Sequence, residues 1–238
     1  MKRSRIYGPA VALLLALTAG GMANAGSVDA AFTLSLGGQT IGQGQYSAAL
    51  TGDAYRLKGG VAIAGAPEQE NRPLFSGTAG SFGTIRGDRL EVKGFSAGIK
   101  GGKGPQALTL DAARLRGFID PLGMILLPVM QGGDPCARTL HVFDGQHQFD
   151  LILKSGGPTR YRIAADGGSR TGVRCSAQFV PRKGFGKDDP VLPLRTGDGV
   201  LLWLTPAQGG SVWMPLRVQV RFGDGALTAE VTRFVERD

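Results

Sequence analysis

Residues 134–179 read DPCARTLHVFDGQHQFDLILKSGGPTRYRIAADGGSRTGVRCSAQF, and this stretch decides the fold class. It holds both cysteines and both histidines of the chain, and its apolar residues alternate with polar ones between Gly-containing turns. Alternation with a period of two is typical of strands that bury one face. The stretch therefore predicts four antiparallel strands that follow one another as a meander.

The first hairpin of this stretch turns at Asp144-Gly145, a pair that tolerates the positive φ angles of a type I′ turn. A two-residue loop places Val142 opposite His147, and His147 then joins the apolar face while His141 joins the other. Histidines on opposite faces do not form a metal-binding pair, and no acidic or thiolate partner stands at ligand spacing. We expect neither a metal site nor a cofactor. Burial would select this register because it gathers apolar side chains on one face: Leu140, Val142, Phe149 and Leu151.

The N-terminal 25 residues have the parts of a secretory signal peptide. Basic residues precede an apolar core from about residue 10 to 19, and Ala23-Asn24-Ala25 gives an A-x-A cleavage signature. The core is too short to span a membrane as a mature helix. We expect residues 1–25 to be cleaved after Ala25, leaving residues 26–238 as one periplasmic domain without a transmembrane segment. Cleavage removes three basic and no acidic residues, so the formal net charge of +8 becomes +5.

Cys136 and Cys175 are expected to form a structural disulfide, because export places them in an oxidising compartment and no C-x-x-C motif suggests redox activity. In a flat meander, the first and fourth strands lie about 14 Å apart, at about 4.8 Å a spacing. A disulfide needs Cα atoms within about 7 Å of each other. Either the sheet curls strongly, or Cys136 folds back before its strand begins, as Pro135 would permit.

The rest of the chain has the same character of short strands between turns. Glycine accounts for 39 of 238 residues and is distributed along the chain at expected turns, without a collagen period or an internal repeat. Pro215 interrupts an expected strand over residues 212–222 and predicts a bulge or an edge there. These features predict a mainly β protein, built as a single strongly curved antiparallel sheet that is partly closed like a barrel.

Residues 119–130, IDPLGMILLPVM, are the most apolar stretch after the signal peptide. Asp120 can cap a helix that has Pro121 at its first position, and Pro128 limits its length. The segment therefore predicts one short apolar helix packed on the sheet. Alternatively, it forms a mobile lid over an apolar cavity, because methionine suits a variable ligand. In that interpretation, the segment supplies the candidate ligand-binding residues: Leu122, Met124, Ile125, Leu126 and Val129.

Residues 94–98, GFSAG, match the G-x-S-x-G pattern of a serine nucleophile. That chemistry requires a strand, a sharp elbow and then a helix. The following residues, IKGGKGP, cannot begin a helix, so we expect no catalytic role for Ser96. A hydrolase would also need a base near the nucleophile, and the register of His141 and His147 argues against one.

Several short motifs occur in an order that covers nearly the whole mature chain: Ile41-Gly42 after a Gly-Gly turn, Ile119-Asp120-Pro121-Leu122, the run from Cys136 to Phe149, Phe179-Val180-Pro181 after Cys175, and Trp203 to Phe234. In this order they resemble an exported Gram-negative family, domain-of-unknown-function family 3108, whose members are uncharacterised periplasmic β-rich proteins. The resemblance implies a compartment and an architecture but no activity. Gly123 departs from the pattern, which has Ser after Pro-Leu, so this position is not expected to be catalytic.

These features favour a non-enzymatic periplasmic protein of the cell envelope, with a concave apolar face that holds a lipid or acyl chain. The alternative is an interaction module that docks an envelope protein or an anionic glycan through a basic surface or an open sheet edge. No interleaving of aromatic and basic residues suggests a nucleic-acid partner.

Overall fold

The computed structural model describes residues 25–64, 73–101, 106–163, 168–186, 199–222 and 225–238. They form one antiparallel sheet of 13 strands. The strands are β1 (Ala25–Leu36), β2 (Gln39–Thr51), β3 (Ala54–Ala64), β4 (Pro73–Arg86), β5 (Arg89–Gly101), β6 (Gln106–Asp111), β7 (Leu127–Pro128), β8 (Thr139–Phe143), β9 (Gln148–Arg162), β10 (Ser169–Lys183), β11 (Val200–Ala207), β12 (Val212–Phe222) and β13 (Gly225–Arg237). The predicted single antiparallel sheet is thus confirmed.

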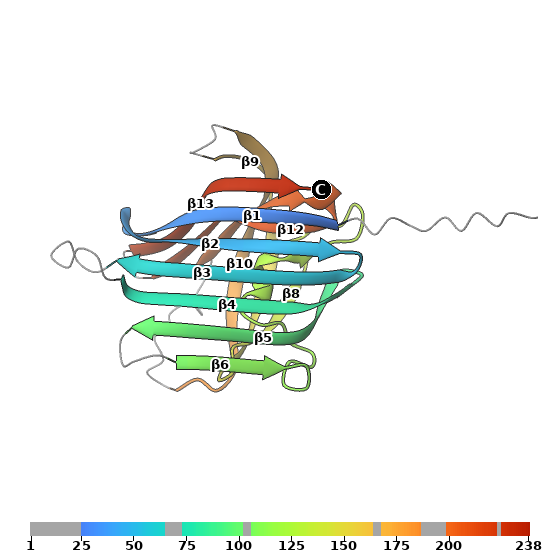
Figure 1. The fold of residues 1–238 in the computed structure, drawn as a ribbon. Coiled ribbons are helices and arrows are strands. Elements are labelled where there is room, and N and C mark those ends of the chain that lie inside the picture. The colour runs from blue at the N-terminus through green and yellow to red at the C-terminus, as the bar shows by residue number, and fades with distance from the viewer. Residues whose placement is uncertain (1–24, 65–72, 102–105, 164–167, 187–198, 223–224) are drawn as a thin grey trace, which may run out of the picture.

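The sheet folds over on itself into two layers. Its strand order is β6-β5-β4-β3-β2-β1-β13-β12-β11-β10-β9-β8, with β7 paired to β12 off this path. Strands β1 to β6 form the front layer, and β9 and β10 pass behind it at a steep angle (Figure 1). The edge strands β6 and β8 do not pair with each other, so the sheet is not closed and the expected partial closure into a barrel is wrong. Ile119, which lies outside the sheet strands, bonds to β8: its N–H donates to the His141 carbonyl at 2.8 Å, and its carbonyl accepts from the Phe143 N–H at 3.0 Å.

The hairpin between β8 and β9 has a wider turn than the sequence predicted. Val142 pairs with Phe149 rather than with His147, so residues 144–147 form the loop. The carboxylate of Asp144 explains the difference, because its Oδ1 accepts the N–H groups of Gln146 at 2.8 Å and His147 at 2.6 Å. The predicted register was therefore wrong by two residues. Each apolar side chain keeps its face, because faces alternate with a period of two.

Strand β9 combines two of the predicted strands. Gly156-Gly157 forms a bulge in it, since Val173 of β10 pairs with Pro158 while Cys175 pairs with Ser155. Cys175 consequently lies two strands from β8 instead of three. Cys136 sits before β8 begins, and the predicted disulfide to Cys175 is present with a Cα–Cα distance of 5.5 Å. The chain folds back at Cys136, before β8 begins, and this brings the two Cα atoms within the distance that a disulfide needs.

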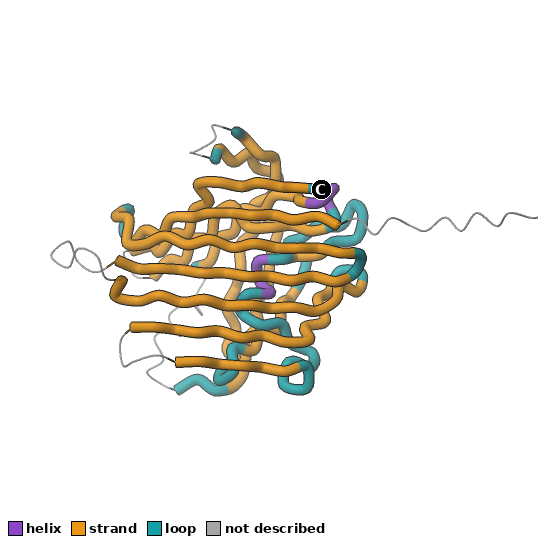
Figure 2. The backbone as a smooth tube through the Cα atoms, in the orientation of Figure 1, coloured by secondary structure: helices purple, strands orange, loops and turns teal. Residues whose placement is uncertain are grey.

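The predicted apolar helix is wrong, because the described residues contain no α-helix. Only a 3-10 turn, η2 (Gly123–Ile125), forms in this segment, and its N-cap is Leu122 rather than the expected Asp120; the Asp120 carboxylate instead accepts the Gly123 N–H at 2.9 Å. Leu127 and Pro128 then leave the turn and pair with β12 as β7. Pro128 has no N–H to continue a helix, and strand pairing satisfies the backbone groups on either side of it. We call residues 119–129 the inner segment; its turn lies behind the front strands (Figure 2).

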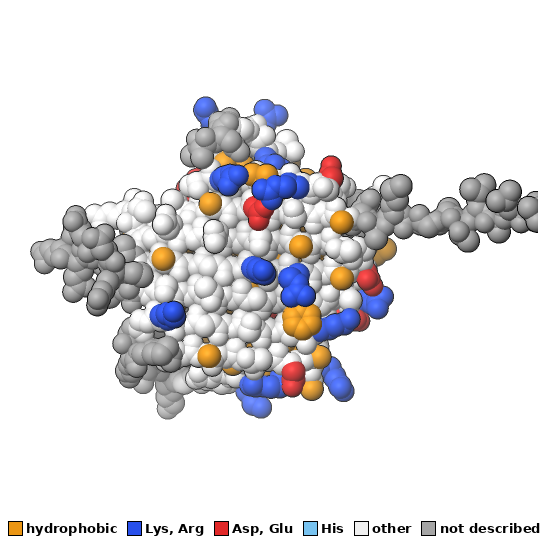
Figure 3. Space-filling model, in the orientation of Figure 1, with side chains coloured by type: hydrophobic (Ala, Val, Ile, Leu, Met, Phe, Trp, Pro, Cys, Tyr) orange, Lys and Arg blue, Asp and Glu red, His pale blue; other side chains and the backbone are white. Residues whose placement is uncertain are grey.

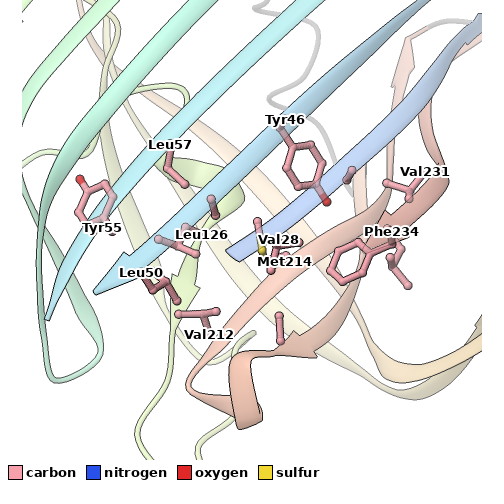
Figure 4. Close-up of a cluster of buried hydrophobic side chains, with 14 of the residues drawn as sticks. Val28, Tyr46, Leu50, Tyr55, Leu57, Leu126, Val212, Met214, Val231 and Phe234 are labelled. Atoms are coloured by element: carbon pink, nitrogen blue, oxygen red, sulfur yellow. The ribbon is translucent and has the colours of Figure 1, made fainter. Parts of the chain in front are cut away.

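The largest hydrophobic cluster fills the space between the two layers and the inner segment (Figure 4). Leu57 comes from the front layer, Val212 and Met214 from β12, and Leu126 from the inner segment, and all four are fully buried. Burying a side chain of this size stabilises the fold by roughly 1.5–3 kcal/mol. The hydroxyl of Tyr46 donates to the Pro215 carbonyl at 2.7 Å and joins the layers across this core.

Pro215 itself lies where the sequence predicted a bulge or an edge. The register between β11 and β12 shifts beside it, and β12 pairs with β13 only from Arg217 onward. Both expected features therefore occur at this residue. The departure of β12 from β13 also leaves room for β7 to pair with β12.

Candidate functional site

An apolar groove begins where the core ends on the inner face of the front layer. Along β3, β5 and β6, the inward-facing residues are buried toward one end of the strand and only half-buried toward the other. The buried and half-buried members are Leu57 and Val61 on β3, Phe95 and Ile99 on β5, and Leu110 and Leu108 on β6. The groove that results has a volume of about 770 Å³.

The floor of the groove consists of small residues. Gly59, Gly77, Ala79 and Ala97 lie side by side on β3, β4 and β5. A Cβ atom built on Gly77 would lie 3.6 Å from side-chain atoms of Phe75 and Val61, which is ordinary contact. The short side chains therefore keep space open above the floor. Gly59 has another role: a Cβ there would lie 3.0 Å from Leu122, so glycine lets the inner segment approach the sheet.

The inner segment forms the opposite wall with Pro121, Leu122 and Ile125. Buried Asp120 holds it in place. Its Oδ1 accepts the N–H groups of Leu122 and Gly123 at 2.9 Å each, and its Oδ2 accepts the Ser81 hydroxyl of β4 at 2.6 Å. Burial raises the pKa of Asp120, and these hydrogen bonds oppose the rise. Three bonds to one carboxylate thus fix the wall against the sheet.

The turn between β8 and β9 closes the groove on the side of β6. Gly145 approaches Leu108 so closely that a Cβ on it would lie 2.8 Å from the leucine. His147 Nδ1 lies 2.9 Å from Asp144 Oδ2, and its ring stacks on Phe185 with centroids 4.7 Å apart. Burial alone would raise the pKa of Asp144, but hydrogen bonds from the backbone and ring of His147 and from the Gln146 N–H lower it. This turn adds three polar side chains to the lining, those of Asp144, Gln146 and His147.

The five residues proposed from sequence fall into two groups. Leu122 and Ile125 line the groove. Leu126 and Val129 are buried, the first in the main core, and half-buried Met124 does not line the groove. Sequence reasoning missed the floor entirely, although the Gly- and Ala-rich strand sequences over residues 77–80 and 97–98 carried a signal for it.

The structure gives Ser96 no setting of a catalytic nucleophile. Ser96 lies within β5, exposed, and the G-x-S-x-G residues form continuous strand rather than an elbow. His141 contacts Asp150, with Nδ1 to Oδ1 at 2.8 Å. Among the described residues, no group of three or more His, Cys, Asp or Glu side chains is arranged to hold a metal ion. Within the same ranges, no helix is long and apolar enough to cross a membrane.

Comparison with known proteins does not identify a function for the groove, so its function is inferred from its geometry. No protein-family model matches the chain, and no curated protein is significantly similar to it.

Proposed function

We propose that this is a non-enzymatic periplasmic protein of the cell envelope that binds the acyl chain of a lipid in the apolar groove. One observation carries the proposal: the inward face of the front layer continues past the core as a half-buried apolar groove of about 770 Å³. Ligand sites are typically about 300–1,000 Å³ and mostly apolar. Each methylene group that leaves water gains about 0.8 kcal/mol.

The lining favours an acyl chain over a compact polar ligand. Aliphatic and aromatic side chains flank the floor, among them Val61, Phe75, Ile99 and Leu108. Among the described residues, no lysine or arginine lines the groove, and Asp144 is its only carboxylate. An anionic head group would find no cation there, whereas an uncharged chain needs none. We therefore assign the groove to the apolar part of a lipid.

The periplasmic part of the proposal comes from the signal peptide expected over residues 1–25 and from the family resemblance. Residues 1–24 lie outside the described residues, and β1 begins at Ala25. The disulfide between Cys136 and Cys175 supports this location, because such bonds persist mainly in oxidising compartments.

A fluorescence titration tests the groove. The mature protein is titrated with 11-(dansylamino)undecanoic acid, which brightens when its chain enters an apolar site, and oleate is added as a competitor. Ala97→Phe puts a ring on the floor and should weaken binding about tenfold or more, which is about 1.4 kcal/mol. Ser96→Phe adds the same ring to the outer face of β5 and is the matched control. Non-saturable binding by the unmodified protein, or equal binding by both variants, would refute the assignment.

The outer face of the front layer favours a second function, docking of an anionic glycan. Lysine and arginine side chains spread over this face (Figure 3), and the guanidinium of Arg56 lies 5.7 Å from the ring centre of half-exposed Phe82. Lys58 and Lys100 project from the same face. Binding through this face should weaken steeply with salt, since exposed charges are screened. Affinity chromatography on an anionic polysaccharide, at low and high salt, distinguishes it from binding in the groove.

A further inference from the structure

A second cleft, also of about 770 Å³, lies against the inner segment and shares no lining residue with the apolar groove. The inner segment contributes Leu122 and Ile125 to the groove but Ile119, Leu126 and Leu127 to this cleft. It therefore stands between the two spaces. The two sites can be occupied by different ligands.

The charge of this cleft differs from that of the groove. Arg86, Arg89, Arg116 and Arg138 line it, whereas Asp88 and Glu91 are the only carboxylates that described residues bring to it. Between these arginines, the surface is apolar, with Leu90, Val92 and Leu115 among its residues. A cationic wall beside an apolar floor is complementary to a molecule that carries an anion on an apolar body.

Arg138 is the most buried of these cations, and no carboxylate of a described residue lies within ion-pair distance of it. Its Nη1 donates to two backbone carbonyls, that of Pro128 at 2.8 Å and that of Asp88 at 3.2 Å, and its buried Nε finds no hydrogen-bond partner in the described part of the chain. Burial lowers the pKa of Arg138, with Asp88 and Asp134 opposing the change at longer range. A guanidinium remains charged in proteins. A partly buried charge without a counter-ion is costly, and a bound anion would offset that cost.

The backbone around Arg138 is fixed in place before any ligand arrives. Its N–H donates to the Cys136 carbonyl at 2.9 Å, and its own carbonyl accepts the Leu153 N–H of β9 at 2.9 Å. The disulfide from Cys136 to Cys175 anchors the chain two residues earlier. Side chains on a rigid backbone bind with less loss of conformational entropy.

The other arginines are only weakly engaged. Arg116 is exposed and forms no ion pair with any described residue, and Arg89 has a single long contact of 3.9 Å, to Asp88. Arg86 contacts Asp53 at 3.3 Å and Glu91 at 3.6 Å through an exposed side chain. Exposed pairs of this kind contribute little, so an incoming anion can compete with them.

We propose that this cleft binds an organic anion, a phosphate or carboxylate attached to an apolar group. The anion lies on Arg138, with Arg116 and Arg89 beside it, and the apolar part covers Leu90 and Leu115. Guanidinium groups suit this role because they bind both kinds of oxyanion through paired hydrogen bonds.

Calorimetric titration of the mature protein with hexyl phosphate, hexanoate and hexanol tests this. We expect the two anions to bind saturably and hexanol to bind at least about tenfold more weakly. The double variant Arg89→Gln/Arg116→Gln removes exposed side chains and should weaken hexyl phosphate about tenfold without affecting folding. Lys58→Gln/Lys100→Gln removes equal charge from the outer face and should change nothing. Arg138→Gln should have the largest effect of the three.

Equal affinity for hexanol and hexyl phosphate, or equal weakening by both double variants, would overturn the proposal. The variant Ala97→Phe distinguishes this cleft from the groove. We expect it to bind hexyl phosphate as the unmodified protein does. If Ala97→Phe lost hexyl phosphate binding, the anion would lie in the groove instead. Vesicles containing phosphatidic acid distinguish the source of the anion. Binding to vesicles without binding to hexyl phosphate would assign recognition to a membrane surface and contradict a site in the cleft.

Discussion

Removing the carboxylate of Asp120 should detach the inner segment from the front layer. The carboxylate accepts three hydrogen bonds, from the Leu122 N–H, the Gly123 N–H and the Ser81 hydroxyl. In Asp120→Ala these three donors lose their acceptor in or near the core. An unsatisfied buried donor costs roughly 1–3 kcal/mol, so we expect a loss of about 4 kcal/mol after relaxation. Asp120→Asn keeps Oδ1 for both N–H groups, and its loss should be about 1 kcal/mol or less.

The pH dependence provides a second signature of the same residue. Because burial raises the pKa of Asp120 in the folded state, the folded protein holds this proton more tightly than the unfolded chain. Stability from this group is therefore greatest below the unfolded-state pKa, about 3.9, and falls as pH rises through the folded-state pKa. Asp120→Asn has no carboxylate at this position, so it should not show this loss of stability with rising pH. The difference in the free energy of unfolding between the unmodified protein and Asp120→Asn should therefore change between the unfolded-state and the folded-state pKa of Asp120.

Urea unfolding with the disulfide intact measures both effects. The midpoint and slope give the free energy of unfolding for the unmodified protein and the two variants at several pH values. The dansyl-fatty-acid titration then reports whether Asp120→Ala also weakens the groove, whose wall it loosens. A loss below about 1 kcal/mol in Asp120→Ala would refute the reasoning. An equal loss in both variants would also refute it.

Three further predictions use the same unfolding assay. Replacing Cys136 and Cys175 together with serine should lower stability by about 2–4 kcal/mol, and an unchanged midpoint would contradict a structural disulfide. Asp150 is hydrogen-bonded to His141 and to Arg182, whose Nε and Nη2 donate at 2.8 and 2.5 Å. Burial alone would raise the pKa of Asp150, but these hydrogen bonds lower it. Stability should therefore be lost as pH falls through the folded-state pKa of Asp150. Asp150→Asn should remove that acid-dependent loss, and an identical acid profile would count against it. Leu126→Ala, at a fully buried site, should cost about 2–5 kcal/mol, and a cost below 1 kcal/mol would mean that Leu126 is not core.

The strands could be predicted because local patterns determine them. Apolar alternation and glycine-containing turns indicated a single antiparallel sheet of consecutive strands, and Pro215 located the bulge in β12. The errors arose where one side chain or one distant strand decided the outcome. The carboxylate of Asp144 widened its turn by binding two backbone N–H groups, which dipeptide preferences do not encode. Pairing of Leu127 with Trp213, far along the chain, replaced a helix that local residues favoured.

The groove was only partly predictable for a related reason. The apolarity of the inner segment indicated a ligand wall, and two of its five proposed residues, Leu122 and Ile125, do line the groove. Which residues of an irregular segment face a cavity depends on its tertiary contacts, here the bonds of Asp120 and β7. The floor residues, such as Gly77 and Ala97, look like ordinary turn or strand residues until the strands are placed side by side.

Native mass spectrometry of the protein purified from the periplasm, under non-denaturing conditions, tests lipid binding in the groove most directly. The unmodified protein and Ser96→Phe should each retain a lipid mass that Ala97→Phe lacks. A bare mass for all three proteins, still bare after incubation with oleate, would contradict the assignment of the groove to an acyl chain.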